Sequence, residues 1–189
     1  MRLAIFGGTF DPIHNAHLAV AREAVARCRL DLVWFVVAEQ PPHKAGVTHA
    51  SYEDRVRMVE LACEDEPNFE ASRAEQGTGR SYSIDTIHKV RAQLAPDDRL
   101  FFLIGADAFA EIETWRRWRD VVQAVEFIVV SRPGHEFRVP GGATVHRLES
   151  VEMTISSSDI RRQLAAGDDQ VPLPAPVIEY IRSRGLYWS

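Results

Sequence analysis

The stretch FGGTFDPIHNAHL spans Phe6 to Leu18 and directly follows the apolar run Leu3 to Ile5. An apolar run, two glycines, a turn and then a helical pattern predict a β-strand, a loop and the start of a helix near Asn15. Gly7 and Gly8 let the backbone approach a bulky anion closely, and a helix that begins after them aims free N–H groups at that anion. The opening of the chain therefore predicts a phosphate-binding loop at the end of a strand.

Two histidines three residues apart lie at the start of this helix. His14 and His17 share one face of the first helical turn, where their imidazoles can donate hydrogen bonds to phosphoryl oxygens as charge moves. A lone histidine would more often be a satisfied surface or core residue. The stretch contains neither the GxGxxG fingerprint nor a Walker A loop, and no cysteine or third histidine stands at zinc-ligand spacing nearby. With these alternatives excluded, we interpret the stretch as a site for phosphate chemistry that uses no metal ion bound by protein side chains.

Apolar strands alternate with helical segments along the chain. Residues 18–26 continue the first helix, and the apolar run 32–37 predicts a strand buried on both faces, which completes a βαβ unit. Further strands are predicted at 100–104, 127–130 and 144–147, with a short one at 69–71 left open. We therefore expect an α/β fold, a doubly wound Rossmann-like parallel sheet of about five strands flanked by helices.

In such a sheet the loops after the strands meet along one edge, where ligands bind. Pro41-Pro42-His43-Lys44 delivers a cation to that edge, although composition alone favours a solvated lysine in an exposed turn. Gly105-Ala106-Asp107 directly follows a strand, and Asp107 there is either a ligand contact or a helix cap. Arg132 follows the next strand, where a guanidinium is well placed to meet a phosphate.

Two further helix starts carry hydroxyl groups. The segment SYSIDT, Ser81 to Thr86, opens a helix in which Ser83 is a candidate N-cap. The segment ISSSDIR, Ile155 to Arg161, combines hydroxyls, free N–H groups and a guanidinium into a second anion cradle. A run of three serines is by itself mostly a capping segment. We interpret it as functional because a second anion cradle, the loop after the first strand, is also predicted in this chain.

The composition and charge of the chain argue against several kinds of partner and favour one compartment. The 189 residues include 22 basic and 27 acidic ones, a net charge of −5 without a basic block, which argues against nucleic acid as a partner. The apolar run before Gly7 is too short for a signal or membrane segment, so we expect no membrane partner. Cys28 and Cys63 form no CxxC pair and suggest no disulfide framework, which favours the reducing cytoplasm.

Several ordered segments resemble one family. GGTFDPIHNAHL is similar to the GGxFDPxHxGH signature of the nucleotidyltransferase superfamily that joins an adenylyl group to a small phosphorylated substrate, with Ala16 in place of a glycine. SYSIDT resembles the SYTxxTL element of its bacterial nicotinate mononucleotide branch. The run from LIGADAF to TW resembles IIGxDxxxxxxTW, which distinguishes that branch from the phosphopantetheine adenylyltransferases. ISSSDIR resembles ISSTxIR, and Gly185-Leu186-Tyr187 resembles a GLY ending that we interpret as packing without chemistry.

The resemblance implies a nicotinate-mononucleotide adenylyltransferase, which makes nicotinate adenine dinucleotide (deamido-NAD) and pyrophosphate from ATP and nicotinate mononucleotide in NAD biosynthesis. The implied mechanism is in-line attack of the mononucleotide phosphate on the α-phosphorus of ATP, with Mg2+ arriving on the ATP. Two alternatives stay open: another adenylyltransferase, such as the phosphopantetheine type, and a non-catalytic nucleotide-binding module. A homo-oligomer also stays open.

The site residues expected from these segments fall into three groups. The catalytic group is His14, His17, Lys44 and Arg161. The ATP contacts are Gly7, Gly8, Thr9, Phe10, His17, Gly105, Asp107, Ser157, Ser158, Ile160 and Arg161. The mononucleotide contacts are Lys44, Tyr82, Ser83, Ile84, Thr86, Trp115 and Arg132, with the Trp115 indole stacked on the pyridine ring. We expect one domain over residues 1–189, in which about 151–189 form a helical phosphate-binding subregion.

Overall fold

A parallel sheet of six strands forms the centre of the computed structural model, in the order β3-β2-β1-β4-β5-β6. The structure describes residues 1–40, 48–77, 79, 82–150 and 155–188. The strands are β1 (Arg2–Gly8), β2 (Leu32–Val37), β3 (Phe69–Ser72), β4 (Arg99–Gly105), β5 (Glu126–Ser131) and β6 (Thr144–Glu149). This order confirms the predicted doubly wound α/β fold. The predicted count of about five strands was one too low, because the short segment β3 pairs with β2 at the sheet edge.

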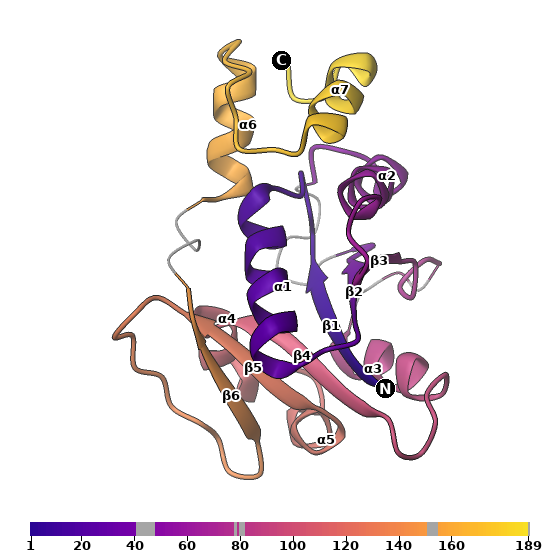
Figure 1. The fold of residues 1–189 in the computed structure, drawn as a ribbon, viewed down its shortest axis with the longest axis vertical. Coiled ribbons are helices and arrows are strands. Elements are labelled where there is room, and N and C mark those ends of the chain that lie inside the picture. Colours follow the sequence, from indigo (N-terminus) through magenta and orange to yellow (C-terminus); the bar gives the residue numbers. More distant parts are fainter. Residues whose placement is uncertain (41–47, 78, 80–81, 151–154, 189) are drawn as a thin grey trace.

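Helices cover both faces of this sheet. They are α1 (Asn15–Cys28), α2 (Tyr52–Cys63), α3 (Ser83–Arg91), α4 (Ala106–Ala110), the 3₁₀ turn η1 (Ile112–Thr114), α5 (Trp118–Ala124), α6 (Ser157–Ala165) and α7 (Ala175–Arg184). Figure 1 shows α1 crossing one face of the sheet, while α6 and α7 extend beyond the sheet at one end. Among the described residues, no helix combines the length and the apolar character needed to cross a membrane.

Two hydrophobic cores hold these layers together. Successive side chains of a strand point to opposite faces, so Ala4 and Ile5 of β1 belong to different cores. The core around Ala4 includes residues of α1, α2, α6 and α7, and the core around Ile5 includes residues of α3, α4 and α5. The C-terminal helices are thus built into the same core as the opening helix.

The strand register decides where the loops meet. In β1, Gly8 lies opposite Val37 of β2, and Phe6 lies opposite Leu103 of β4. All three strands run parallel, so the loops that follow Gly8, Val37 and Gly105 leave the same edge of the sheet. This edge is where the sequence predicts the ligand site.

Helix boundaries test the local predictions. The helix predicted over Tyr52–Cys63 is confirmed, with Ser51 as its N-cap accepting a hydrogen bond from the Asp54 N–H at 3.1 Å. The prediction that Ser83 caps the next helix was wrong: Tyr82 occupies the N-cap position without a side-chain bond, and Ser83 is the first helical residue. The Tyr82 side chain supplies no capping oxygen, so within the described part of the chain the first N–H groups of α3 have no side-chain acceptor.

Candidate active site

The loop after β1 is shaped by the Phe10 ring. Phe10 adopts φ of 48°, in the left-handed region, and its side chain is 2% exposed. A Cβ atom at Gly8 would lie 2.7 Å from the Phe10 ring, so no larger residue fits there without displacing that ring. Packing therefore explains the second glycine of the signature directly, and the close approach of a ligand is an additional consequence.

The two signature histidines form a stacked pair at the start of α1. His14 is the N-cap residue, and its N–H donates to Nδ1 of His17 at 3.2 Å. The two imidazole rings stack with centroids 3.7 Å apart at an angle of 25°. Because Nδ1 of His17 accepts a hydrogen bond, the proton of the neutral ring lies on Nε2, which makes Nε2–H the available donor.

Burial keeps both imidazoles neutral near pH 7. It lowers the pKa of His14 to about 4, and it lowers the pKa of His17 well below the ordinary value, with a further contribution from His14. Desolvation disfavours the charged form of an imidazole, and two stacked imidazolium ions would repel each other. The pair can therefore donate hydrogen bonds to an anion without carrying a positive charge in the free protein.

The start of α6 contacts the loop after β1. Ser157 Oγ donates to the Pro12 carbonyl at 2.9 Å, and Arg161 Nη1 donates to the Asp11 carbonyl at 2.7 Å. Arg161 also donates to Ser158 Oγ at 3.2 Å. The two predicted anion cradles, from opposite ends of the chain, thus lie together.

The three serines at the start of α6 have different roles. Ser156 is the N-cap and accepts from the Asp159 N–H at 3.2 Å, so capping does not occupy Ser157 or Ser158. Ile160 is 1% exposed, and its side chain belongs to the core of the protein. The Ile160 N–H donates to the Ser156 carbonyl at 3.1 Å, so both its side chain and its N–H are engaged within the protein.

The Asp11 carboxylate connects three segments, and no pattern in the sequence indicates this role. Its oxygens accept hydrogen bonds from the His49 N–H at 2.7 Å, the Ala50 N–H at 3.1 Å and the Tyr187 hydroxyl at 2.6 Å. Burial and the adjacent Asp11 carboxylate raise the pKa of Tyr187 above its ordinary range. The GLY ending packs against the core as predicted, and Tyr187 in addition anchors the signature loop through this hydrogen bond. An aspartate before a proline predicts a turn and does not identify such partners.

Other predicted residues lie along the same edge. Gly105 ends β4 and is the N-cap of α4, which places Asp107 in the exposed first turn of that helix. Arg132 is exposed directly after β5. Lys44 lies outside the described residues.

The predicted pyridine side joins the start of α3 to the segment after η1. Trp115 is half-buried and packs edge-on against Phe102, with ring centroids 5.8 Å apart. The guanidinium of Arg116, which the sequence analysis did not single out, lies 4.7 Å from the centre of the Tyr82 ring. Tyr82 and Trp115 therefore belong to neighbouring segments in space, as the predicted pocket requires.

The remaining residues of that helix start are more enclosed. Ile84 is 1% exposed and Thr86 is 4% exposed. The Thr86 hydroxyl donates to Glu75 Oε1 at 2.7 Å, so it is engaged with a buried carboxylate. A ligand at this place would meet the backbone N–H groups of Ser83 and Ile84 before it meets these side chains.

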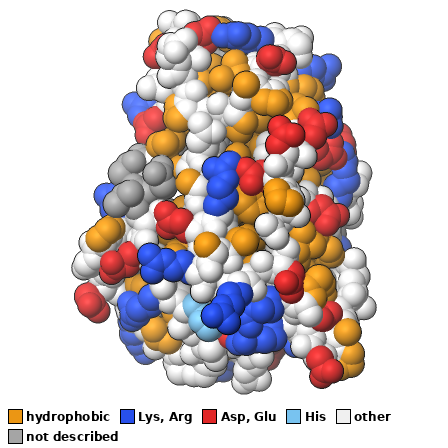
Figure 2. Space-filling view, in the orientation of Figure 1, with side chains coloured by type: hydrophobic (Ala, Val, Ile, Leu, Met, Phe, Trp, Pro, Cys, Tyr) orange, Lys and Arg blue, Asp and Glu red, His pale blue; other side chains and the backbone are white. Residues whose placement is uncertain are grey.

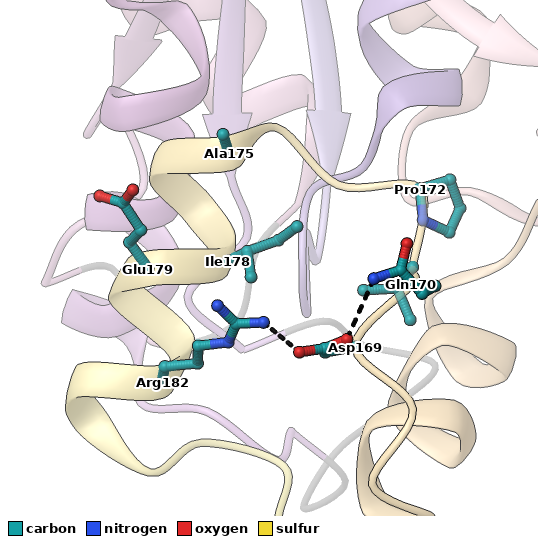
Figure 3. A pocket seen from close by; sticks show the side chains of 8 residues that line it. Asp169, Gln170, Pro172, Ala175, Ile178, Glu179 and Arg182 are labelled. Atoms are coloured by element: carbon teal, nitrogen blue, oxygen red, sulfur yellow. Dashed lines mark hydrogen bonds and ion pairs between the residues drawn. The ribbon is translucent and has the colours of Figure 1, made fainter.

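A cavity beside α7 lies away from this edge. It has a volume of about 450 Å3, its lining includes Ala175 and Ile178, and an ion pair between Arg182 and Asp169 crosses it (Figure 3). The lining of this cavity shares no residue with either anion cradle.

A basic group lies at the amino-terminal ends of the strands. Figure 2 shows Lys and Arg side chains gathered around a histidine toward the lower end of the face that α1 covers. At that end of the sheet, Arg99 and His146 contact Glu126 Oε2 at 2.6 and 2.7 Å. Glu126 pairs with Arg99 and also contacts the His146 imidazole, so we assign no anion site to this group. Among the residues that the structure describes, no cluster of three His, Cys, Asp or Glu side chains is arranged to hold a metal ion.

The similar proteins named below carry the same name. The cytidylyltransferase-like family profile matches residues 5–163. A Solibacter usitatus protein named "Probable nicotinate-nucleotide adenylyltransferase" is 66% identical over 187 residues, which cover 99% of this chain and 100% of that protein. A Thermus thermophilus protein of the same name is 41% identical over 189 residues, with 99% and 100% of the two chains covered.

A solved structure supports the fold. The Plasmodium falciparum nicotinic acid mononucleotide adenylyltransferase complexed with NaAD superposes with a TM-score of 0.79. The match covers 98% of this chain and 97% of that one, at 20% sequence identity. At this identity the likeness concerns the fold alone.

Proposed function

Because the chain belongs to the nicotinate-nucleotide adenylyltransferases of the cytidylyltransferase-like family, we propose that it transfers the adenylyl group of ATP to nicotinate mononucleotide. The products are nicotinate adenine dinucleotide and pyrophosphate, and the reaction is a step in NAD biosynthesis. One observation carries the proposal: Ser157 and Arg161 of α6 reach the Pro12 and Asp11 carbonyls of the signature loop. Hydroxyl, guanidinium and histidine donors thereby converge on the place where a triphosphate would lie.

The chemistry needs no protein nucleophile. The phosphate of the mononucleotide attacks the α-phosphorus in line, and the protein contributes position and charge stabilisation. Nε2–H of His17 donates to a phosphoryl oxygen, and this bond strengthens as charge moves toward the leaving pyrophosphate. His14 lies beside it in the stacked pair and supplies a second donor. The remaining N–H groups of Arg161, the Ser158 hydroxyl and the Ser157 backbone N–H are assigned to the β and γ phosphates, since the Ser157 hydroxyl already donates to Pro12.

The metal ion belongs to the substrate in this proposal. The buried carboxylate of the signature loop, Asp11, already accepts three hydrogen bonds, so it does not fit the role of a free metal ligand. Mg2+ is commonly held by substrate phosphates with few protein ligands, and when bound to ATP it neutralises part of the developing charge.

The pyridine ring is assigned to the surface between Tyr82 and Trp115. The Trp115 indole stacks on the ring, and the N–H groups of Ser83 and Ile84 meet the nicotinate carboxylate at the uncapped start of α3. Lys44 and Arg132 are assigned to the phosphate of the mononucleotide.

The organisation of the chain follows from the same contacts. We assign residues 1–189 to one domain, because α6 and α7 share the core of α1 and α2. We place the enzyme in the cytoplasm, with ATP and nicotinate mononucleotide as partners and no nucleic-acid or membrane partner. Light scattering would measure whether the protein is a monomer or a homo-oligomer.

The test is a substrate panel. The purified chain is mixed with Mg2+ and ATP, and then with nicotinate mononucleotide, nicotinamide mononucleotide or phosphopantetheine, while pyrophosphate release and the dinucleotide product are measured. We expect rapid release with nicotinate mononucleotide and formation of one dinucleotide per pyrophosphate. Release with phosphopantetheine alone would assign the other adenylyltransferase branch. ATP binding without release in any mixture would indicate a non-catalytic module.

A further inference from the structure

Arg55 is an arginine buried inside the domain with no carboxylate in direct contact, and Asp11 is the acidic group that acts on it at longer range. Its side chain lies on α2 and is 1% exposed. Among the described residues, no carboxylate lies within 4.0 Å of its guanidinium. Burying an unpaired charge is costly, and an arginine stays protonated in proteins. The Asp11 carboxylate offsets part of this cost from a distance, and the guanidinium N–H groups need acceptors that they contact directly.

Backbone carbonyls of two loops take that place. Arg55 Nη1 donates to the Thr9 carbonyl at 2.8 Å and to the Ala38 carbonyl at 2.7 Å. Arg55 Nη2 donates to the Glu39 carbonyl at 3.3 Å. Thr9 belongs to the loop after β1, and Ala38 follows β2. A single nitrogen atom thus joins the two loops that leave neighbouring strands at the predicted ligand edge.

The direction of these carbonyls determines the direction of the adjacent N–H groups. The Thr9–Phe10 peptide is trans, since the cis bond of this loop lies at Asp11-Pro12. In a trans peptide the C=O and the following N–H point in opposite directions. With the Thr9 carbonyl turned inward to Arg55, the Phe10 N–H points away from the guanidinium. No acceptor for this N–H is found among the described residues.

We infer that Arg55 is a positioning residue for the triphosphate: it holds the Thr9 and Ala38 carbonyls inward, so that the Phe10 N–H faces the phosphates, and it leaves a positive charge beneath them. The inference rests on the proposed function, because it takes ATP as the ligand. A polyanion above the loop adds to the charge balance that the Asp11 carboxylate and the carbonyls supply in part. The Tyr52 ring, with its centre 5.6 Å from the guanidinium carbon, adds a weak cation–π contact on one side.

Calorimetric titration with Mg-ATP tests this role in the full chain. Arg55→Met keeps the length of the side chain without charge or donors, and Arg55→Lys keeps the charge without the planar fork. We expect the Kd for ATP to rise at least about tenfold in Arg55→Met, with a smaller rise in Arg55→Lys. The KM for nicotinate mononucleotide should stay near the native value, because Arg55 lies beneath the loop after β1, which we assign to ATP.

The control separates this effect from loss of stability. Val59 lies one turn along α2, is 0% exposed and belongs to the same core. Val59→Ala should lower the melting temperature and leave the Kd for ATP unchanged, with all titrations run well below every melting temperature. Native ATP affinity in folded Arg55→Met, or an equal loss in Val59→Ala, would overturn the inference.

A measurement on the native chain keeps the test independent of folding. With 15N-labelled phenylalanine, the nine phenylalanine amides give separate signals, and Phe10→Leu identifies that of Phe10. We expect the Phe10 amide signal to move when Mg-ATP is added. An unmoved signal in protein that binds ATP would contradict the inference. A native chain that shows no ATP binding would instead contradict the proposed function.

Discussion

Tyr187→Phe removes one hydrogen bond that anchors the signature loop to the C-terminal segment. The Tyr187 hydroxyl lies 2.6 Å from Asp11 Oδ1, which is the distance of a strong bond to a carboxylate. The substitution keeps the ring, and the carboxylate keeps the His49 and Ala50 N–H donors. The loss is therefore a single charge-assisted hydrogen bond, worth about 2 kcal/mol.

This magnitude predicts two measurable effects. For a chain of this length, about 2 kcal/mol lowers the melting temperature by about 4–8 °C, and urea unfolding should report the same loss of free energy. Arg161 donates to the carbonyl of the same Asp11, so a loosened loop should also weaken ATP binding, by at most about thirtyfold. Thermal melts and calorimetric titration with Mg-ATP measure the two effects separately.

Tyr180→Phe is the matched control. The Tyr180 hydroxyl donates to Asp54 Oδ1 at 2.8 Å, which is also a tyrosine–carboxylate bond in the C-terminal part but lies away from the signature loop. We expect Tyr180→Phe to lower stability and leave ATP affinity unchanged. A Tyr187→Phe protein with native stability and native ATP affinity would refute the reasoning. Equal loss of ATP affinity in both variants would show that general docking of α7, rather than the Asp11 contact, matters.

Four further predictions concern the proposed site. His17→Ala should lower turnover about a hundredfold, equivalent to about 3 kcal/mol, with little change in ATP affinity, because its bond strengthens in the transition state; near-native turnover in steady-state kinetics would exclude the role. Arg161→Lys should weaken ATP binding measured by calorimetry, since a lysine keeps the charge but loses the planar fork; unchanged affinity in Arg161→Ala would reject the phosphate assignment. Trp115→Ala should raise the KM for nicotinate mononucleotide and leave that for ATP nearly unchanged, whereas a collapsed melting temperature would return Trp115 to a core role. Burial lowers the pKa of His14 from 6.5 to about 4, so the unfolded chain binds the extra proton between these values. This contribution to stability, about 3 kcal/mol, should be fully present above pH 6.5 and lost as the pH falls toward 4 in urea titrations. His14→Asn should reduce that dependence and leave the part that comes from His17, whose pKa burial also lowers.

Local patterns in the sequence determined the elements around the site. The run from β1 through Gly8 to α1, the limits of α2 and its Ser51 cap follow from apolar periodicity and capping, which act between residues close in sequence. The order of strands and helices was also accessible, because continuous apolar runs indicate parallel strands buried on both faces. The short strand β3 was left open, since four residues carry too little pattern to separate a strand from a loop.

Only the tertiary structure decided which distant groups meet. Ser157 and Pro12 are 145 residues apart, and Tyr187 and Asp11 are 176 apart, yet both pairs are joined by hydrogen bonds. A single polar side chain has no periodicity, so nothing in its neighbourhood identifies a distant partner. The same holds for Arg55, whose carbonyl partners have no side-chain signature at all. Packing of α2, α6 and α7 in the core of α1 brings these donors to the loop, and that packing is a property of the folded chain.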